Sequence, residues 1–365
     1  TETMYTAAKL WLNRIPGGLA GTTNLAGTGL CSVSGSTIGI AYALGRLSIP
    51  EMLKAGYNKT FALMSVLTSG SVGQLIPPSV LLVVYAGVTQ VPVGDQLLAG
   101  IVPGLALAGI YQLTIMATAI VKPSWAPPDP ARPSWGGRWR SLLPVWPVPL
   151  LALVVVGGLS LGVFTATEAG AVGALGALVL SVVFLRTPRK IGAAVGQALK
   201  GTVASTGSIF LVLLGATFLN RLIALSGLAA DMVRGLDALN LELWQFLVLL
   251  AIIFLVLGTF LEGMTLILLP VPILLPILNQ MEINLVWFGI FLVLLVELAT
   301  LSPPVGLLVF VIYKIAQDPE VNQGHKITLN TVFNAAMLAM PPAILLLLAI
   351  SLVPDIVMWL PLSSR

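Results

Sequence analysis

Three short stretches of this sequence carry the groups best suited to bind an ion. They are Ser34-Gly35-Ser36, residues 73–79 and residues 302–306, which combine hydroxyl side chains with residues that interrupt a helix. The last two contain consecutive prolines, and a proline inside a helix removes a backbone donor and breaks the helix. Carbonyl oxygens freed at such a break, together with nearby hydroxyls, are ligands that a hard cation such as sodium prefers.

The small and polar residues around the two proline pairs predict two sodium sites, one at each helix break. The residues predicted to hold them are Ser34, Gly35, Ser36, Gly73 and Pro77 at the first site, and Gly258, Gly263, Thr300, Ser302 and Pro303 at the second. The alternative is that these small residues only allow close helix packing, as they do throughout membranes.

Three acidic residues lie within or at the edge of apolar runs, where a carboxylate is costly and is a functional candidate by default. Glu262 is predicted to take either an ion-linked or gating role or a structural hydrogen bond. Glu297, six residues before Pro303, is predicted to brace the second break. Glu168 opens a predicted helix after Thr165, so capping and the helix dipole explain it.

The composition requires a membrane protein. The 365 residues are 57% hydrophobic and only 9% charged, whereas a soluble domain has about 25% charged residues. The single cysteine excludes a disulfide within the chain and any multi-cysteine metal site, and the single histidine excludes a histidine-paired metal motif. The sequence also lacks a set of catalytic or metal-binding residues for an intramembrane enzyme, so catalysis is not predicted. The net charge of +4 is carried in short loops, where it reports membrane topology and does not predict nucleic-acid binding.

The hydrophobic pattern predicts, in each half of the chain, a helical hairpin, then a proline-broken helix, then a further span. These segments are residues 19–45, 61–91 and 97–121 in the first half, and residues 244–278, 285–315 and 332–352 in the second. With both hairpins re-entrant, only Arg221, Arg234 and Arg365 of the 18 basic residues fall outside the cytoplasmic side, so 15 obey the positive-inside rule. For the first hairpin the alternative is a single glycine-rich span.

The predicted fold is an all-α polytopic membrane protein built from inverted repeats. The regions are a first repeat (1–121), a cytoplasmic linker rich in proline and tryptophan (122–140), a scaffold-type helix pair with a short interfacial helix (141–200) and a second repeat (201–365). The interfacial helix is predicted over 191–199, with a separate span over 201–225. Inverted repeats with discontinuous helices that meet near the midplane are typical of alternating-access carriers.

Six motifs together resemble the large membrane subunit of tripartite ATP-independent periplasmic (TRAP) transporters. They are Ser34-Gly35-Ser36, residues 73–79, 95–104, 164–169 and 258–263, and residues 302–307. The resemblance extends from about residue 15 to residue 360, and the family's N-terminal spans are missing, so we expect the sequence to be a fragment. Two residues depart from the family pattern. Ile40 stands where many members have an acidic residue, and Gln74 stands where many have a proline.

The resemblance implies a sodium-driven, elevator-type importer of organic acids in the bacterial inner membrane. Its partners would be a small membrane subunit and a periplasmic solute-binding protein. Its substrates would be C4-dicarboxylates, sialic acids or other carboxylates. Sodium would be the coupling ion, and no other cofactor is expected. The residues predicted to contact the substrate are Ser36, Gln74, Ser79, Glu262 and Val305. The alternative is a proton-coupled elevator carrier that works without a binding protein and uses Glu262 and Glu297 as proton sites.

Overall fold

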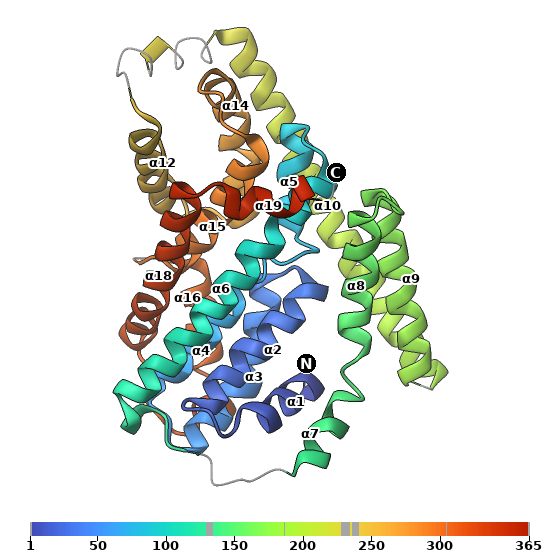
Figure 1. The fold of residues 1–365 in the computed structure, drawn as a ribbon, viewed down its shortest axis with the longest axis vertical. Coiled ribbons are helices and arrows are strands. Elements are labelled where there is room, and N and C mark those ends of the chain that lie inside the picture. The colour runs from blue at the N-terminus through green and yellow to red at the C-terminus, as the bar shows by residue number, and fades with distance from the viewer. Residues whose placement is uncertain are drawn as a thin grey trace.

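The computed structural model describes most of the chain. The described residues are 2–128, 134–185, 187–227, 234–235, 241–303 and 305–363, without the side chains of 32–34, 220, 223 and 224. Throughout these residues the regular secondary structure is helical (Figure 1). The prediction of an all-α chain is therefore confirmed.

The first half contains two helix pairs separated by short breaks. Its elements are α1 (Glu2–Leu12), α2 (Gly18–Ser34), α3 (Thr37–Lys54), α4 (Lys59–Ser71), α5 (Val80–Thr89), α6 (Val93–Val121) and the 3-10 turn η1 (Pro123–Trp125). The predicted hairpin is the pair α2 and α3, which pack against one another on either side of Gly35 rather than forming one span. The predicted broken helix is the pair α4 and α5.

The rest of the chain contains a peripheral group and a second set of broken helices. The peripheral helices are α7 (Trp135–Leu142), α8 (Pro147–Ser160), α9 (Ala166–Leu185) and α10 (Pro188–Ser226). They are followed by α12 (Leu243–Leu257), α13 (Gly263–Leu268), α14 (Pro270–Gln280), α15 (Leu285–Leu301), α16 (Leu307–Ile315), α17 (Pro319–Asn322), α18 (Leu329–Leu352) and α19 (Asp355–Ser363). Among the described residues, five helices are long and apolar enough to cross a membrane, or six if α7 and α8, bent by 49°, form one span.

The first limbs of the two broken helices form the centre of the molecule. In α4 every residue from Phe61 to Ser71 is buried, and in α15 every residue from Val286 to Leu301 is buried. Both helices are therefore enclosed on all sides, α15 with almost entirely apolar side chains and α4 with apolar side chains and hydroxyls that bond to its own backbone. The two proline breaks therefore begin at the ends of the two most enclosed helices.

The hairpins pack crosswise on the broken helices. The first hairpin contacts α4 and also α16, the second limb of the other broken helix. In the second half, α13 contacts α15 and also α5, the second limb of the first broken helix. Each hairpin is thus held between parts of both broken helices. The inverted relation of the two repeats stays a prediction.

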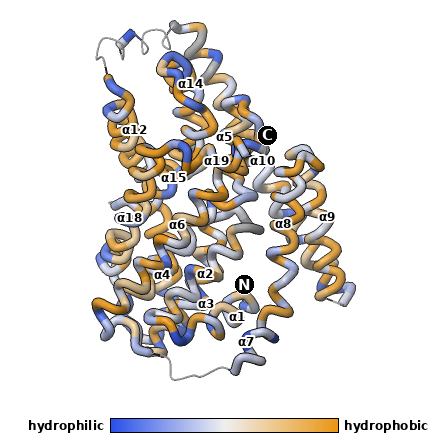
Figure 2. The backbone as a smooth tube through the Cα atoms, viewed as in Figure 1, coloured by the Kyte–Doolittle hydropathy of each residue, from blue (hydrophilic) through white to orange (hydrophobic). Residues whose placement is uncertain are grey.

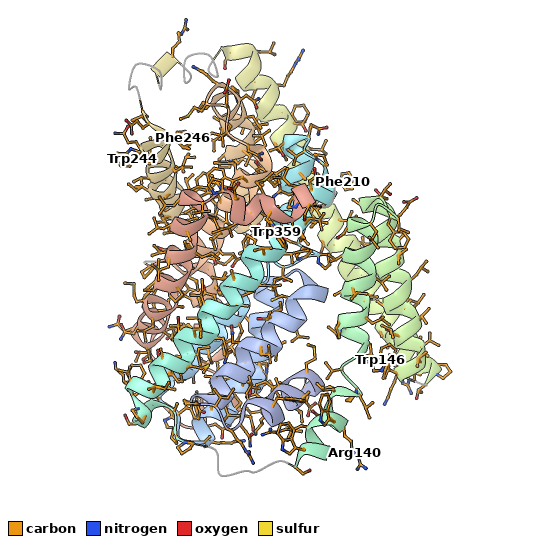
Figure 3. The ribbon with its side chains drawn as sticks, viewed as in Figure 1. Arg140, Trp146, Phe210, Trp244, Phe246 and Trp359 are labelled. Carbon is orange, nitrogen blue, oxygen red and sulfur yellow. The ribbon has the colours of Figure 1, made fainter. Side chains whose placement is uncertain are left out.

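The peripheral helices α8, α9 and α10 pack loosely and present apolar side chains. Only Ala169 is buried in α9, and no residue of the 18-residue apolar window of α10 is buried. Figure 2 shows hydrophobic residues along much of α8 and α9, and Phe210 of α10 is exposed (Figure 3). Such faces are suited to lipid or to another membrane subunit.

One element in this region differs from the sequence prediction. The interfacial helix over 191–199 and the span over 201–225 form one helix, α10. Its only proline is Pro188 at the start, and a glycine such as Gly201 costs only about 1 kcal/mol within a helix. The predicted linker over 122–140 contains η1 and the start of α7. This helix forms because the Ser134 hydroxyl accepts a hydrogen bond from the Gly137 N–H at 3.1 Å. Residues 129–133 and 186 lie outside the described residues.

The predicted capping role of Glu168 is confirmed. Its carboxylate accepts hydrogen bonds from the backbone N–H of Thr165 at 2.8 Å and from the Thr165 hydroxyl at 2.9 Å. The Thr165 hydroxyl in turn accepts from the Glu168 N–H at 3.3 Å. This reciprocal arrangement is a capping box at the start of α9.

Helix α6 closes over the first break through two glycines. A Cβ atom at Gly100 would lie 2.4 Å from the Leu75 carbonyl oxygen, and one at Gly104 would lie 2.7 Å from Ile76 Cγ1. Real Cβ atoms do not approach other atoms so closely, so the backbone of α6 touches the break only because side chains are missing there. Gly109, further along the same helix, has no heavy atom within 4 Å of such a Cβ.

We therefore expect Gly100→Ala to push α6 away from the break and to lower the free energy of unfolding by about 1–3 kcal/mol, as overpacking does. Gly109→Ala is the matched control, expected to be neutral or to stabilise by up to about 1 kcal/mol because alanine favours helix. Thermal melting of the two purified variants in detergent checks this. Equal melting temperatures would show that α6 does not close over the break as described.

Candidate ion-binding site at the helix breaks

The first break is a compact turn closed by several local hydrogen bonds. Between α4 and α5 the Ser79 hydroxyl donates to the Gln74 carbonyl and accepts from the Leu82 N–H at 3.3 Å. Further turns are closed by the Gly73 N–H, which donates to the Gly70 carbonyl at 3.0 Å. Pro77 is buried within this segment. Ser79 thus serves as the N-cap of α5.

The tip of the first hairpin lies directly on this break. Gly35 adopts a left-handed conformation with φ of 55°, and a Cβ there would lie 2.6 Å from the Pro78 carbonyl oxygen. A Cβ at Gly73 would lie 3.4 Å from the Thr37 backbone nitrogen. Ser36 caps α3 by accepting a hydrogen bond from the Gly39 N–H at 3.2 Å. The structure therefore brings the tip and the break together; the Ser34 side chain lies outside the described residues.

The second hairpin lies along α15. A Cβ at Gly258 would lie 2.2 Å from Ala299 Cβ, and one at Gly263 would lie 3.1 Å from Val296 Cγ1. Glu262 is exposed and caps α13, accepting a hydrogen bond from the Met264 N–H at 3.2 Å. Glycine at these two positions allows the hairpin to approach α15 closely. Close packing of the hairpin on α15 is therefore sufficient to explain why residue 258 is a glycine.

The second break turns its carbonyl oxygens toward one glycine. Helix α15 ends at Leu301, and Gly306 has a φ of 55°. A Cβ at Gly306 would lie 2.9 Å from the Ser302 carbonyl oxygen and 3.0 Å from that of Thr300. Only glycine fits this approach, because a side chain would collide with both oxygens. Pro304 lies outside the described residues.

A small cavity of about 50 Å³ connects the two hairpins and the two breaks. Its lining residues are Thr37, Ile38, Gln74, Leu81, Glu262, Gly263, Val296, Glu297, Thr300, Leu307 and Leu308. Four of the predicted site residues thus line one cavity: Gln74, Glu262, Gly263 and Thr300. Ser36, Ser79, Pro303 and Val305 are not among the described residues that line it.

A buried hydrogen bond joins the two halves of the chain at this cavity. The Thr37 hydroxyl donates to Glu297 Oε1 at 2.8 Å, and the Glu297 side chain is only 2% exposed. Glu297 therefore braces the second break against the first hairpin, rather than within its own helix. Thr37 is not among the site residues predicted from the sequence. The signal that the sequence offered was its position immediately after Ser34-Gly35-Ser36, as the first residue of the second limb of the hairpin.

The chemistry of the cavity suits a small hard cation rather than an organic ligand. Pockets for organic ligands usually have volumes of about 300–1,000 Å³, so this cavity has room for an ion or a few waters and not for an organic acid. Its polar atoms are carboxylate, amide and hydroxyl oxygens, the ligands of hard cations. Within the described part of the chain there is no cluster of three histidine, cysteine or acidic residues that would suit a transition metal.

Comparison with known families gives a match over nearly the whole sequence. Residues 1–360 match the family described as tripartite ATP-independent periplasmic transporter, DctM component. The match includes both hairpins, both proline breaks and the peripheral helices.

Characterised relatives agree with this match. The chain is 30% identical over 354 residues to the C4-dicarboxylate TRAP transporter large permease protein DctM of Pseudomonas aeruginosa, covering 97% of this chain and 80% of that protein. It is 30% identical over 361 residues to the sialic acid TRAP transporter large permease protein SiaM of Vibrio cholerae, covering 99% and 81%. It is 29% identical over 310 residues to the ectoine TRAP transporter large permease protein TeaC of Halomonas elongata, covering 85% and 71%. These relatives are permeases, not enzymes.

The Thr37–Glu297 contact makes a prediction about stability. Thr37→Val keeps the shape of the side chain but leaves Glu297 Oε1 buried without its donor, so we expect a loss of about 1–3 kcal/mol in the free energy of unfolding. The matched control is Thr114→Val in α6, whose hydroxyl donates only to Ile110 of its own helix. The control should lose less than about 1 kcal/mol.

The measurement is denaturant or thermal unfolding of both variants beside the parent protein. If Thr37→Val is no less stable than Thr114→Val, the bond between the hairpin and α15 does not hold these elements together.

Proposed function

The chain belongs to the DctM-component family of tripartite ATP-independent periplasmic transporters, and from this premise we propose that it is the large permease subunit of a sodium-coupled importer of organic acids. The observation that carries the proposal is the convergence of both hairpins and both proline breaks on one small, oxygen-lined cavity. Discontinuous helices that meet in this way place ion ligands where alternating access needs them. The proposed location is the bacterial inner membrane.

Sodium is proposed as the coupling ion because the two breaks offer oxygen ligands. At the second break, the carbonyl oxygens of Thr300 and Ser302 both face Gly306. At the first, the Pro78 carbonyl lies against Gly35 at the hairpin tip. Sodium is bound by such carbonyl and hydroxyl oxygens without fixed charge. The residues proposed to hold it are Ser34, Gly35, Ser36, Gly73, Pro77, Gly258, Gly263, Thr300, Ser302 and Pro303.

The proposed substrates are organic acids. C4-dicarboxylates, sialic acid and ectoine, which the relatives' names give as their substrates, each carry a carboxylate. Helices α5 and α16 begin at the two breaks, and the positive ends of such half-helices attract anions. We propose that Ser36, Gln74, Ser79, Glu262 and Val305 contact the substrate in a state that is more open than this one, because the cavity between the breaks is too small to hold it.

An elevator movement is proposed on the basis of the loose contact between the centre and the peripheral helices. A gap of about 590 Å³ separates α5 and α6 from α8 and α9, and another of about 600 Å³ lies between α5 and α10. The lining is almost entirely apolar and includes small residues of α9 such as Ala169, Gly170 and Gly173. Apolar contacts are not directional, so one body can slide along the other without breaking hydrogen bonds.

Two partners are proposed from the tripartite family: a small membrane subunit and a periplasmic binding protein. The exposed apolar faces of α9 and α10 offer area for the small subunit. A binding protein would deliver the substrate and determine most of the selectivity among organic acids. The reason is that no basic residue, which could recognise a particular carboxylate, lines the described cavity between the breaks.

Uptake by the permease and its two partners in proteoliposomes tests the proposal. Labelled organic acid should accumulate only with an inward sodium gradient and with the binding protein present. Ser36→Ala should raise the half-saturating sodium concentration by about tenfold, the effect of losing about 1.4 kcal/mol of binding free energy. Ser181→Ala, whose hydroxyl bonds only to its own helix α9, is the matched control and should leave uptake unchanged.

Uptake that ignores both sodium and the binding protein but follows a proton gradient would contradict the proposal. The proton-coupled carrier without a binding protein would then be favoured.

A further inference from the structure

Glu297 is a buried carboxylate with only one of its two oxygens accounted for. Oε1 accepts the hydrogen bond from Thr37, but Oε2 is buried with no hydrogen-bond partner among the described residues. The same holds for the side-chain oxygen Oε1 of Gln74 in the first break. Both side chains line the cavity of about 50 Å³ that joins the hairpins and the breaks.

The described residues around Glu297 offer no positive charge to neutralise it. The other ionisable residue that lines the cavity is Glu262, which has the same sign. The ion pairs of the described chain join Lys9 to Glu51 and Arg46 to Asp318 and Glu320, and none includes Glu297. A carboxylate without a partner in a low-dielectric interior is very costly, so it needs a bound cation or a proton.

Two hydroxyl oxygens complete the set of ligands. The Thr37 hydroxyl uses its proton on Glu297 Oε1, and the Thr300 hydroxyl uses its proton on the Glu297 backbone carbonyl at 2.8 Å. Each oxygen therefore presents lone pairs rather than a proton to the cavity. These acceptor oxygens, with Glu297 Oε2 and Gln74 Oε1, favour a bound hard cation, which binds through oxygen lone pairs.

We propose that Glu297 and Gln74 bind a sodium ion in this cavity through Glu297 Oε2 and Gln74 Oε1. The inference rests on the proposed function, which it deepens by assigning one coupling ion to side-chain ligands. Gln74 belongs to the first break, Thr37 to the first hairpin, and Glu297 and Thr300 to α15. One ion thus fastens both halves of the chain together and cancels a charge that would otherwise have to cross the membrane with the carrier.

A proton on Glu297 is the competing way to neutralise this charge, so the experiment separates the two. The other titratable groups that face Glu297 are Glu262 at the cavity and Cys31 and Tyr111, which interact with it electrostatically. Working at pH 8 and repeating at pH 6 exposes a proton response from the carboxyl groups, because a thiol and a phenol normally titrate above this range.

The test measures the melting temperature of the purified permease in lipid nanodiscs while sodium chloride replaces choline chloride at constant ionic strength. An ion that binds only the folded state stabilises it by RT ln(1 + [L]/Kd), where [L] is the free ion concentration, so the melting temperature rises with sodium concentration. Wild type should melt at a higher temperature in sodium, and Glu297→Gln, whose amide oxygen still accepts from Thr37, should lose most of this shift. Gln74→Met should need about tenfold more sodium for the same shift, as expected for one lost ligand. Glu320→Gln, whose side chain is 88% exposed and does not line the cavity, is the control and should respond as wild type does.

A Glu297→Gln variant with an unchanged sodium response overturns the inference. If that variant does not fold, an unchanged half-saturating sodium concentration in Gln74→Met overturns it instead. Stabilisation of wild type by acid rather than by sodium, lost in Glu297→Gln, overturns it in favour of a proton.

Uptake measurements separate this inference from the proposed function. Suppose that uptake is driven by sodium, and that Glu297→Gln and wild type have the same half-saturating sodium concentration and Hill coefficient. The proposed function then stands, and only the sodium site at Glu297 is wrong. The opposite outcome is also possible to recognise. If uptake is not driven by sodium but the melting temperature still rises with sodium and this rise requires Glu297, the sodium site stands and the proposed sodium coupling is wrong.

Discussion

The structure depends on one constraint: backbone that leaves the helical pattern inside a membrane must be enclosed by protein. Lipid offers no hydrogen bonds, and each unsatisfied backbone group costs several kcal/mol. The chain meets this constraint by covering each break with glycine-bearing backbone. Gly100 lies on Leu75, Gly35 lies on Pro78, and Gly306 folds over the carbonyls of its own break. The most enclosed helices, α4 and α15, lead into these breaks because unwound backbone is tolerated only at the centre of the molecule.

Crosswise packing follows from the same constraint. A break covered only by neighbours from its own half would leave the two halves independent of one another. Here each hairpin contacts elements of both broken helices, and the Thr37–Glu297 bond spans 260 residues of sequence. An ion bound as proposed in the cavity would contact elements of both halves at once, and differential binding of this kind is how a carrier can couple an ion to a conformational change.

The molecule combines a tightly packed centre with loosely attached peripheral helices. The centre is rich in close glycine contacts, whereas most glycines of α9 and α10 have no heavy atom near the position of a Cβ. The peripheral group is attached at one end through α7, where Arg138 is buried and donates to the Leu10 carbonyl of α1 at 3.0 Å. This contrast in packing separates a tightly packed central body from a group of helices whose exposed apolar faces are suited to lipid or to a partner.

The sequence alone determined the fold class, because 57% hydrophobic composition with 9% charge allows only a membrane protein. It also located the helix breaks, because paired prolines and a Ser-Gly-Ser tip act on their own backbone whatever surrounds them. It could not show that Thr37 meets Glu297, that Gln74 shares their cavity, or that residues 188–226 form one helix. Those outcomes depend on which helices pack together over hundreds of residues, and a contact between distant residues leaves no periodic signal in the chain.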